Sequence, residues 1–138
     1  MSAVPEARRV ADIGAGGGQV ALALTRRGFD VIATELTPAG HALLPAELSR
    51  RCGDGLRVLA SDEVDGVVLA GLGGHSIIRI LAQAPAVAGR LSWLVLQPQQ
   101  HAAALEVWLA KDGYRVEQRW IAQERGRSYT VLRVRPPA

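Results

Sequence analysis

The chain has 138 residues, a hydrophobic fraction of 49%, a charged fraction of 21% and a formal net charge of +3. No apolar run is long enough to span a membrane, residues 1–9 lack the apolar core of a signal peptide, and the single cysteine excludes an internal disulfide. We therefore expect one domain over residues 1–138, cytoplasmic and without a membrane partner, in which Cys52 is a small buried side chain.

The first predicted element is a short strand that runs into a glycine-rich turn. Val10 to Asp12 is apolar up to its terminal acid, four of the five residues from Gly14 to Gly18 are glycine, and Gln19 to Arg27 carries apolar residues at helical spacing. Strand, turn and helix in this order open an α/β nucleotide-binding sheet, because glycine allows positive φ and close approach of a ligand. The alternative is a glycine-rich turn that binds nothing.

The spacing of these glycines separates two kinds of ligand. A dinucleotide fingerprint, G-x-G-x-x-G, would need a glycine where the chain has Gln19. Asp12, Gly14, Gly16 and Gly18 instead form D-x-G-x-G-x-G, which resembles the pattern of class I S-adenosylmethionine (SAM) methyltransferases. A pyrophosphate favours a helix N-terminus, whereas SAM has no phosphate and carries a sulfonium cation, which an acid at the strand end suits better.

The second predicted strand, Asp30 to Glu35, also ends in an acid. Glu35 follows the glycine turn by about twenty residues, the position from which a carboxylate accepts hydrogen bonds from the two hydroxyls of a ribose. We therefore assign ribose binding to Glu35, with an ordinary surface glutamate as the alternative.

The next segment is expected to form a helix and a third strand. Thr37 and Pro38 suit the cap and the first position of a helix that runs towards Arg50, interrupted or shortened by Pro45. Leu56 to Ala60 is the predicted strand.

An aspartate with two interpretations precedes that strand. Asp54 and Gly55 can form an Asp-Gly turn. Equally, Asp54 can accept a hydrogen bond from the exocyclic amine of an adenine. The residues alone favour neither.

A continuous apolar run predicts the central strand of a parallel sheet. Asp65 to Ala70 forms this strand, Gly71 to His75 forms a second glycine-rich turn, and Ser76 to about Ala84 forms an amphipathic helix. Ligands of open α/β sheets bind at the carboxyl ends of the strands, so this turn is a second candidate binding segment. His75 can touch a substrate there, although a histidine that faces solvent is the favoured alternative.

The last third of the chain predicts one more parallel step and a hairpin. Leu91 to Leu96 is a buried strand followed by Gln97 to Gln100, and His101 to Lys111 is a helix. Tyr114 to Ile121 and Ser128 to Val134 alternate as a β-hairpin does. The predicted fold class is α/β and Rossmann-like, with a mostly parallel central sheet, helices on both faces and a C-terminal antiparallel β-hairpin, the element order of the class I methyltransferase sheet.

Four further segments are similar to those of one family. Asp54 to Leu56, Val67 to Gly74, Leu96 to Gln99 and Tyr129 to Val131 occur in the order, and at about the distances, seen in bacterial tRNA (adenine-N1)-methyltransferases that modify position 22 of tRNA. The resemblance covers Val10 to Val134. It implies a SAM-dependent transfer of methyl to N1 of adenine in tRNA, with Gln97, Pro98 and Gln99 at the substrate mouth. It implies a SAM site formed by Asp12, Gly14, Gly16, Gly18, Glu35, Asp54, Gly55, Ala70, Gly71, Leu72 and Gly73.

The chain departs from this family within the glycine turn. The family continues its first motif with an Asp-His-Ala-Tyr-Leu-Pro segment, to whose aspartate catalysis is attributed. Here that segment is replaced by Gly16 to Ala21, which contains no acid. The sequence therefore assigns no catalytic residue, and the candidates near the substrate are Gln97, Pro98, Gln99 and His75.

The expected tRNA contact is the C-terminal hairpin. The family carries helical segments before its first strand and after its last, to which tRNA binding is attributed, whereas this sequence starts almost at its first strand and stops just after the hairpin. We expect tRNA to contact arginines there, with a merely solvated face as the alternative. These arginines are Arg125, Arg127, Arg133 and Arg135.

Two other functions stay open on the sequence. The missing acid favours a SAM-dependent methyltransferase for a small-molecule or protein acceptor, since a fold does not determine its substrate. A catalytically inactive SAM-binding module is the other. The three scattered histidines and one cysteine provide no ligand spacing, so no metal site is expected.

Overall fold

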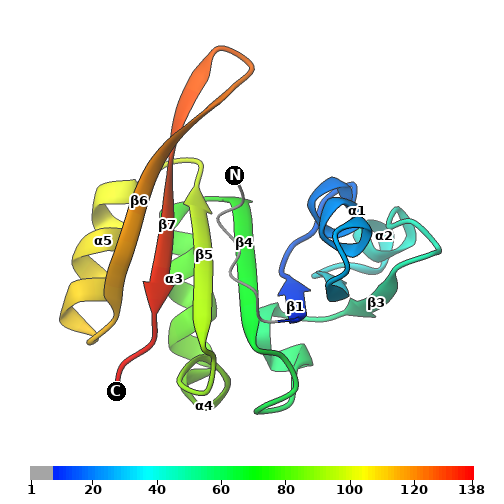
Figure 1. The fold of residues 1–138 in the computed structure, drawn as a ribbon, viewed down its shortest axis with the longest axis horizontal. Helices are drawn as coiled ribbons and strands as arrows, with labels where there is room; N and C mark the ends of the chain where they lie inside the picture. Colours follow the sequence, from blue (N-terminus) through cyan, green and yellow to red (C-terminus); the bar gives the residue numbers. More distant parts are fainter. Residues whose placement is uncertain (1–7) are drawn as a thin grey trace.

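One seven-stranded sheet forms the centre of the protein (Figure 1). The computed structural model describes residues 8–138, and its strands lie in the order β3-β2-β1-β4-β5-β7-β6. β1 to β5 pair in parallel, while β7 runs antiparallel to both β5 and β6. The mostly parallel sheet and its terminal antiparallel hairpin are therefore confirmed. The strands are β1 (Arg9–Asp12), β2 (Asp30–Glu35), β3 (Ser49–Cys52), β4 (Gly66–Leu72), β5 (Trp93–Pro98), β6 (Arg115–Glu124) and β7 (Arg127–Arg135).

The strands that follow β1 in the chain lie on both sides of it in the sheet, with β2 and β3 on one side and β4 and β5 on the other. From β1 the chain proceeds outward to β2 and β3, then returns to β4 on the other side of β1 and proceeds to β5. Connections from β1 and β4 therefore leave the sheet in opposite directions, which opens a crevice at the carboxyl ends of these two strands. The first glycine-rich turn follows β1, and the second predicted one, Gly71 to His75, spans the end of β4 and the start of α3, so the topology brings both to the crevice.

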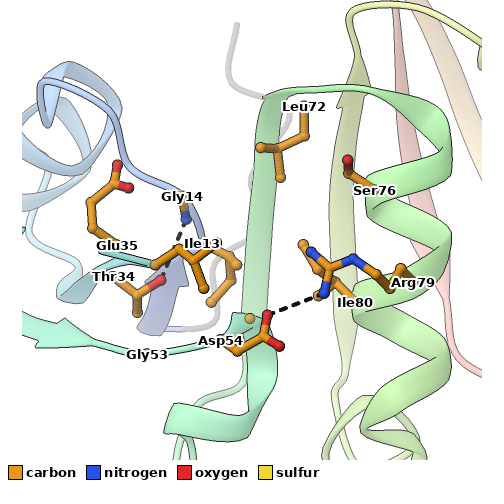
Figure 2. Close-up of a pocket in the computed structure, with 12 residues that line it drawn as sticks. Ile13, Gly14, Thr34, Glu35, Gly53, Asp54, Leu72, Ser76, Arg79 and Ile80 are labelled. Atoms are coloured by element: carbon orange, nitrogen blue, oxygen red, sulfur yellow. Dashed lines mark hydrogen bonds and ion pairs between the residues drawn. The ribbon is translucent and has the colours of Figure 1, made fainter. Parts of the chain in front are cut away.

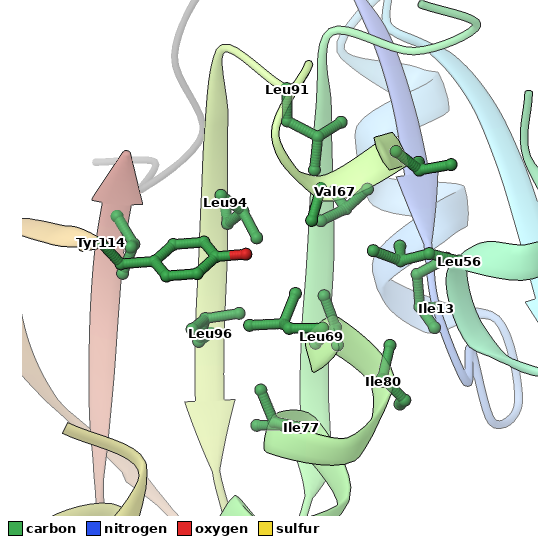
Figure 3. Packing of buried hydrophobic residues seen from close by; sticks show 14 of the residues in the cluster. Ile13, Leu56, Val67, Leu69, Ile77, Ile80, Leu91, Leu94, Leu96 and Tyr114 are labelled. Atoms are coloured by element: carbon green, nitrogen blue, oxygen red, sulfur yellow. The ribbon is translucent and has the colours of Figure 1, made fainter. Parts of the chain in front are cut away.

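Helices cover both faces of the sheet, as the sequence predicts. Alternate residues of a strand face opposite sides, and Val10 and Ala11 of β1 accordingly belong to two separate buried clusters. The cluster that contains Ala11 includes Leu69, Leu94 and Ile77 (Figure 3). The helices on the face of Val10 are α1 (Gln19–Arg26) and α2 (Pro38–Ala42), and those on the other are the 3-10 turn η1 (Gly55–Val58), α3 (Gly74–Gln83), α4 (Pro85–Ala88) and α5 (Ala102–Lys111).

The segment between β2 and β4 differs from the expectation. The helix that begins at Pro38 ends at Ala42, in line with the expectation that Pro45 shortens it, whereas residues 49–52 form a strand that was not expected. This strand has a polar sequence because it lies at the edge of the sheet, with no fully buried residue. The prediction of a strand from Leu56 to Ala60 is wrong, because residues 55–58 form a 3-10 turn. Leu56 and Leu59 are both buried, and a 3-10 turn places residues three apart on the same side.

Smaller differences concern one side chain and several boundaries. Cys52 is exposed at the end of the edge strand, so the expectation that it is buried is wrong. The helix after the second glycine turn starts at Gly74 rather than Ser76, and the short α4 follows it without having been predicted. Both strands of the hairpin are longer than expected, and the turn between them is correspondingly tighter.

Candidate functional site

The first glycine turn has the left-handed backbone that only glycine adopts readily. Gly14, Gly16 and Gly18 have φ of 68°, 59° and 84°. They differ in what surrounds them. A Cβ on Gly18 would lie 2.8 Å from Pro45 Cδ, whereas one on Gly16 would meet no atom within 4 Å. The absence of a side chain at Gly18 therefore lets the turn pack against Pro45, which lies just after α2. The absence of a side chain at Gly16 leaves open space in front of the turn.

The end of β2 holds this turn in place. The backbone N–H of Gly16 donates to Glu35 Oε1 at 2.5 Å, and that of Ala15 donates to the Thr34 carbonyl oxygen at 2.9 Å. The N–H of Gly14 donates more weakly to Thr34 Oγ1, at 3.4 Å. The two predicted binding segments, the glycine turn and the acid of the second strand, are thus in direct contact.

Asp12 lies beneath the turn as a buried acid. Its side chain is only 3% exposed, and its Oδ2 has no hydrogen-bond partner among the described residues. Burial, and next the negative charge of Glu35, raise the pKa of Asp12 to about 7. A carboxylate in such a position is stabilised by any cation that binds at the carboxyl edge of β1.

The first of two adjoining pockets lies between the ends of β1 and β2 on one side and β4 and α3 on the other. Its volume is about 210 Å³. Figure 2 shows Glu35 and Thr34 on one side and Leu72 and Ser76 on the other. Apolar walls with a few convergent polar groups are typical of small-molecule sites. Its lining residues are Ile13, Gly14, Thr34, Glu35, Leu36, Gly53, Asp54, Gly55, Leu72, Ser76, Arg79 and Ile80.

An ion pair crosses one end of this first pocket. Arg79 Nη1 on α3 lies 3.2 Å from Asp54 Oδ1, and Asp54 also lies 4.0 Å from Arg57 (Figure 2). Both interpretations of Asp54 agree with this geometry. The residue precedes η1 in a turn, where Gly55 has φ of 58°, and its carboxylate also faces the pocket.

The second pocket lies in front of the first glycine turn, with a volume of about 260 Å³. It shares Gly14 with the first pocket, so the two pockets adjoin at this residue, and both are lined by residues at the carboxyl end of β4. A larger cavity, of about 400 Å³, is lined by Pro85 of α4, Trp108 of α5 and Pro137, and it shares no lining residue with these two pockets. The second pocket is lined by Gly14, Ala15, Gly16, Gly17, Gln19, Val20, Ala70, Gly71, Gln97, Gln99 and Glu124.

The structure brings most of the predicted site residues to these two pockets. Those that line neither are Asp12 and Gly18, which lie beneath and behind the glycine turn, and Gly73, Pro98 and His75. His75 is exposed beside the ring of His101, 4.5 Å away between centroids, in line with the solvent-facing alternative. The predicted residues that line a pocket are Gly14, Gly16, Glu35, Asp54, Gly55, Ala70, Gly71, Leu72, Gln97 and Gln99.

Several residues that line the pockets are not among those predicted from the sequence. Ser76, Arg79 and Ile80 are spaced as one face of a helix, a signal that was available once α3 was predicted. Thr34 directly precedes the acid of the second strand. No pattern in the neighbouring sequence marks Glu124 as a site residue. Apart from Gln97 and Gln99, every other residue that lines the second pocket lies more than fifty residues earlier in the chain.

The four hairpin arginines have different surroundings. Arg135 Nε lies 2.6 Å from Glu117 Oε2, and Arg133 Nε lies 3.6 Å from Glu117 Oε1. Arg125 and Arg127 are exposed at the tip of the hairpin and form no ion pair within residues 8–138. The tip therefore presents two positive charges to solvent.

The described part of the chain lacks two further features. No helix in it is long and apolar enough to cross a membrane. Within the same residues, no group of three or more histidine, cysteine, aspartate or glutamate side chains could hold a metal ion.

The comparisons with known proteins agree with this geometry. A family model described as a methyltransferase domain matches residues 1–132. The chain is 37% identical over 89 residues to the tRNA (adenine(22)-N(1))-methyltransferase of Bacillus subtilis, an alignment that covers 64% of this chain and 37% of that protein. The predicted resemblance is therefore confirmed, while the chain spans well under two thirds of this relative's length.

Solved structures give the same result for the fold. The crystal structure of the B. subtilis M1A22 tRNA methyltransferase TrmK matches with a TM-score of 0.86 and 31% identity, covering 97% of this chain and 62% of that one. Sp1610 of Streptococcus pneumoniae, in complex with S-adenosyl-L-methionine, matches with a TM-score of 0.84 and 26% identity, covering 93% and 65%. The Rossmann-like methyltransferase fold predicted from the sequence is confirmed.

Proposed function

The chain belongs to the methyltransferase-domain family, and we propose that it is a SAM-dependent methyltransferase that transfers methyl to N1 of an adenine in tRNA. The observation that carries the proposal is the pair of adjoining pockets at the carboxyl ends of β1 and β4, which Glu35 and the glycine turn border. The similarity to the B. subtilis tRNA methyltransferase supports the acceptor.

The residues present fit SAM. Glu35 and Asp54 offer carboxylates at the first pocket, suited to the ribose hydroxyls and the adenine amine, with Ile13, Leu72 and Ile80 as apolar walls for the base. Asp12 supplies the negative charge for the sulfonium, and its buried Oδ2 without a partner supports this role. The cofactor site that we propose comprises Asp12, Gly14, Gly16, Gly18, Glu35, Asp54, Gly55, Ala70, Gly71, Leu72 and Gly73.

The second pocket is the proposed place of the acceptor base. SAM supplies an electrophilic methyl group on its sulfonium, so the protein must chiefly position the two reactants and exclude water. Gln97 and Gln99 at the end of β5 can donate and accept hydrogen bonds at the edge of a base. Buried Pro98 holds the backbone between them.

The remaining parts of the proposal concern the whole chain. Residues 1–138 act as one methyltransferase domain, tRNA contacts the hairpin through Arg125 and Arg127 in particular, and the protein works in the cytoplasm. The exposed charges at the hairpin tip support the tRNA contact. The absence of an acid from the glycine turn favours a second candidate, a methyltransferase for a small-molecule or protein acceptor.

Calorimetric titration tests the cofactor first. Wild-type protein should bind SAM and not NAD, and Glu35→Ala should weaken SAM binding by at least about tenfold, because a carboxylate accepting two hydroxyl donors contributes more than about 1.5 kcal/mol. Glu47→Ala, which removes an exposed glutamate outside both pockets, is the matched control and should bind as wild type does. Absence of SAM binding by the wild-type protein would contradict the proposal.

The acceptor is tested next with labelled methyl groups. Transfer from SAM to tRNA, followed by nucleoside analysis, should give 1-methyladenosine. Transfer to protein or small molecules with none to tRNA would establish the second candidate. SAM binding without any transfer would leave an inactive binding module.

A further inference from the structure

The second pocket contains one ionisable side chain, which comes from a distant part of the chain. Glu124 is the only residue with an ionisable side chain among those that line the pocket, and the longer polar side chains with it are Gln19, Gln97 and Gln99. It is exposed and forms no ion pair within residues 8–138. Its negative charge is therefore available to whatever enters the pocket.

The length of the hairpin explains how Glu124 reaches this place. The pairing of β5 with β7 ends at Leu96 and Leu132, but the pairing of β6 with β7 continues for five more residue pairs, to Glu124 and Arg127. In Figure 1 this overhang projects beyond the carboxyl ends of β4 and β5. The last residue of β6 thus lines the same pocket as the glycine turn after β1, more than a hundred residues earlier in the chain.

We propose that Glu124 is a catalytic residue of the methyl transfer, whose carboxylate stabilises the positive charge that develops on the acceptor base. The inference rests on the proposed function. The lone pair of adenine N1 forms a bond to the methyl carbon while the carbon–sulfur bond breaks, and its electron pair stays on sulfur. No proton has to leave, so the positive charge moves from the sulfonium to the adenine ring.

A carboxylate in the second pocket stabilises the positive charge that forms on the acceptor base in the transition state. The neutral base has little interaction with it, whereas the methylated base is a cation, so Glu124 stabilises the product side of the reaction more than the substrate side. The glycine turn from Gly14 to Gly18 contains no acid. Glu124, the last residue of β6, supplies a carboxylate to the same pocket.

The test compares Glu124→Gln with wild type in methyl transfer to tRNA. The substitution keeps the shape and removes the charge, so kcat should fall by at least about tenfold, while SAM binding and the melting temperature stay unchanged. Glu124→Asp should retain part of the activity, and Glu47→Gln, an exposed glutamate outside the pocket, should retain all of it. An unchanged kcat for Glu124→Gln would overturn the inference and leave the proposed function standing.

A binding measurement gives a readout that does not depend on turnover. With S-adenosylhomocysteine present, wild type should bind the cation 1-methyladenosine about tenfold more tightly than adenosine, and Glu124→Gln should lose this preference. Equal preference in both proteins would overturn the role of the charge. If wild-type protein transfers no methyl to tRNA, the proposed function fails and this inference fails with it.

Discussion

Asp12 is the residue whose surroundings depart most from those of an ordinary aspartate. Its pKa is about 7 in the folded protein and 3.8 in a model peptide, because burial and the charge of Glu35 disfavour ionisation. The folded state therefore holds a proton that the unfolded state releases. Below pH 4 the carboxyl group is protonated in both states, so its burial does not lower the free energy of unfolding. Between pH 4 and pH 7 the free energy of unfolding falls as the pH rises. Above pH 7 the loss stays constant, at up to about 4 kcal/mol.

Asp12→Asn should remove this cost. We expect the variant to gain stability relative to wild type at pH 8 and to gain little at pH 4, which chemical denaturation at the two pH values measures. In wild type, SAM binding should tighten between pH 6 and pH 8 as Asp12 ionises, and Asp12→Asn should lose this pH dependence. A variant destabilised equally at both pH values would show that the buried carboxylate is neutralised by a partner.

Among the elements, β4 and β5 depend on one close contact between a glycine and a tryptophan. Gly66 pairs with Trp93 across the two strands, and both residues are buried. A Cβ on Gly66 would lie 2.0 Å from Trp93 Cε2, within the space that the ring occupies. The ring therefore covers the start of β4 only because that position has no side chain.

Gly66→Ala should destabilise the protein by about 1–3 kcal/mol, because the tryptophan ring must move away from a packed core. Urea denaturation measures the change. Gly73→Ala is the control, since its Cβ would come no closer than 3.6 Å to the Gln100 side chain, and it should stay within about 0.5 kcal/mol of wild type. Adding Trp93→Val to Gly66→Ala should recover part of the loss, and the absence of any difference between the two alanine variants would contradict this account.

At the scale of the whole molecule, the hairpin of β6 and β7 extends past the end of the pairing between β5 and β7 and adds Glu124 to the second pocket. Its tip presents Arg125 and Arg127 without ion pairs in the part of the chain that the structure describes, whereas Arg133 and Arg135 face Glu117 on the paired strands. The hairpin projects beyond the carboxyl ends of β4 and β5 (Figure 1), and Glu124 beside the tip lines the second pocket. A nucleic acid whose base enters the second pocket would therefore meet the two tip arginines with its phosphates.

Replacing Arg125 and Arg127 at the tip should weaken tRNA binding. It should also make the affinity for tRNA less dependent on the salt concentration. Each phosphate contact contributes about 0.7–0.9 to the slope of log K against log salt concentration, so Arg125→Ala with Arg127→Ala should lower the magnitude of the slope by about 1.4–1.8. Filter binding at several salt concentrations measures it. Arg90→Ala, which removes an arginine that pairs with Asp62 from the loop between α4 and β5, should leave the slope unchanged. Equal slopes for all proteins would place the tRNA contact elsewhere.

Patterns within short stretches were enough to predict the parallel sheet, the two glycine turns, the acids at the ends of the first two strands and the terminal hairpin. These features depend on neighbours in the chain: Gly14, Gly16 and Glu35 can be recognised because a turn and a strand end are local structures. The third strand was missed because Ser49 to Cys52 is polar, and its place at the edge of the sheet depends on pairing with β2 rather than on its own residues.

Contacts between distant segments determined the rest of the site. The protonation of Asp12 depends on the turn and helix that bury it, the Asp54–Arg79 ion pair joins η1 to α3, and Glu124 reaches the second pocket through a hairpin that outruns its neighbouring strand. None of these has a sequence spacing of its own. Charge, burial and access are properties of the assembled pocket, and they exist once the sheet has brought its carboxyl ends together.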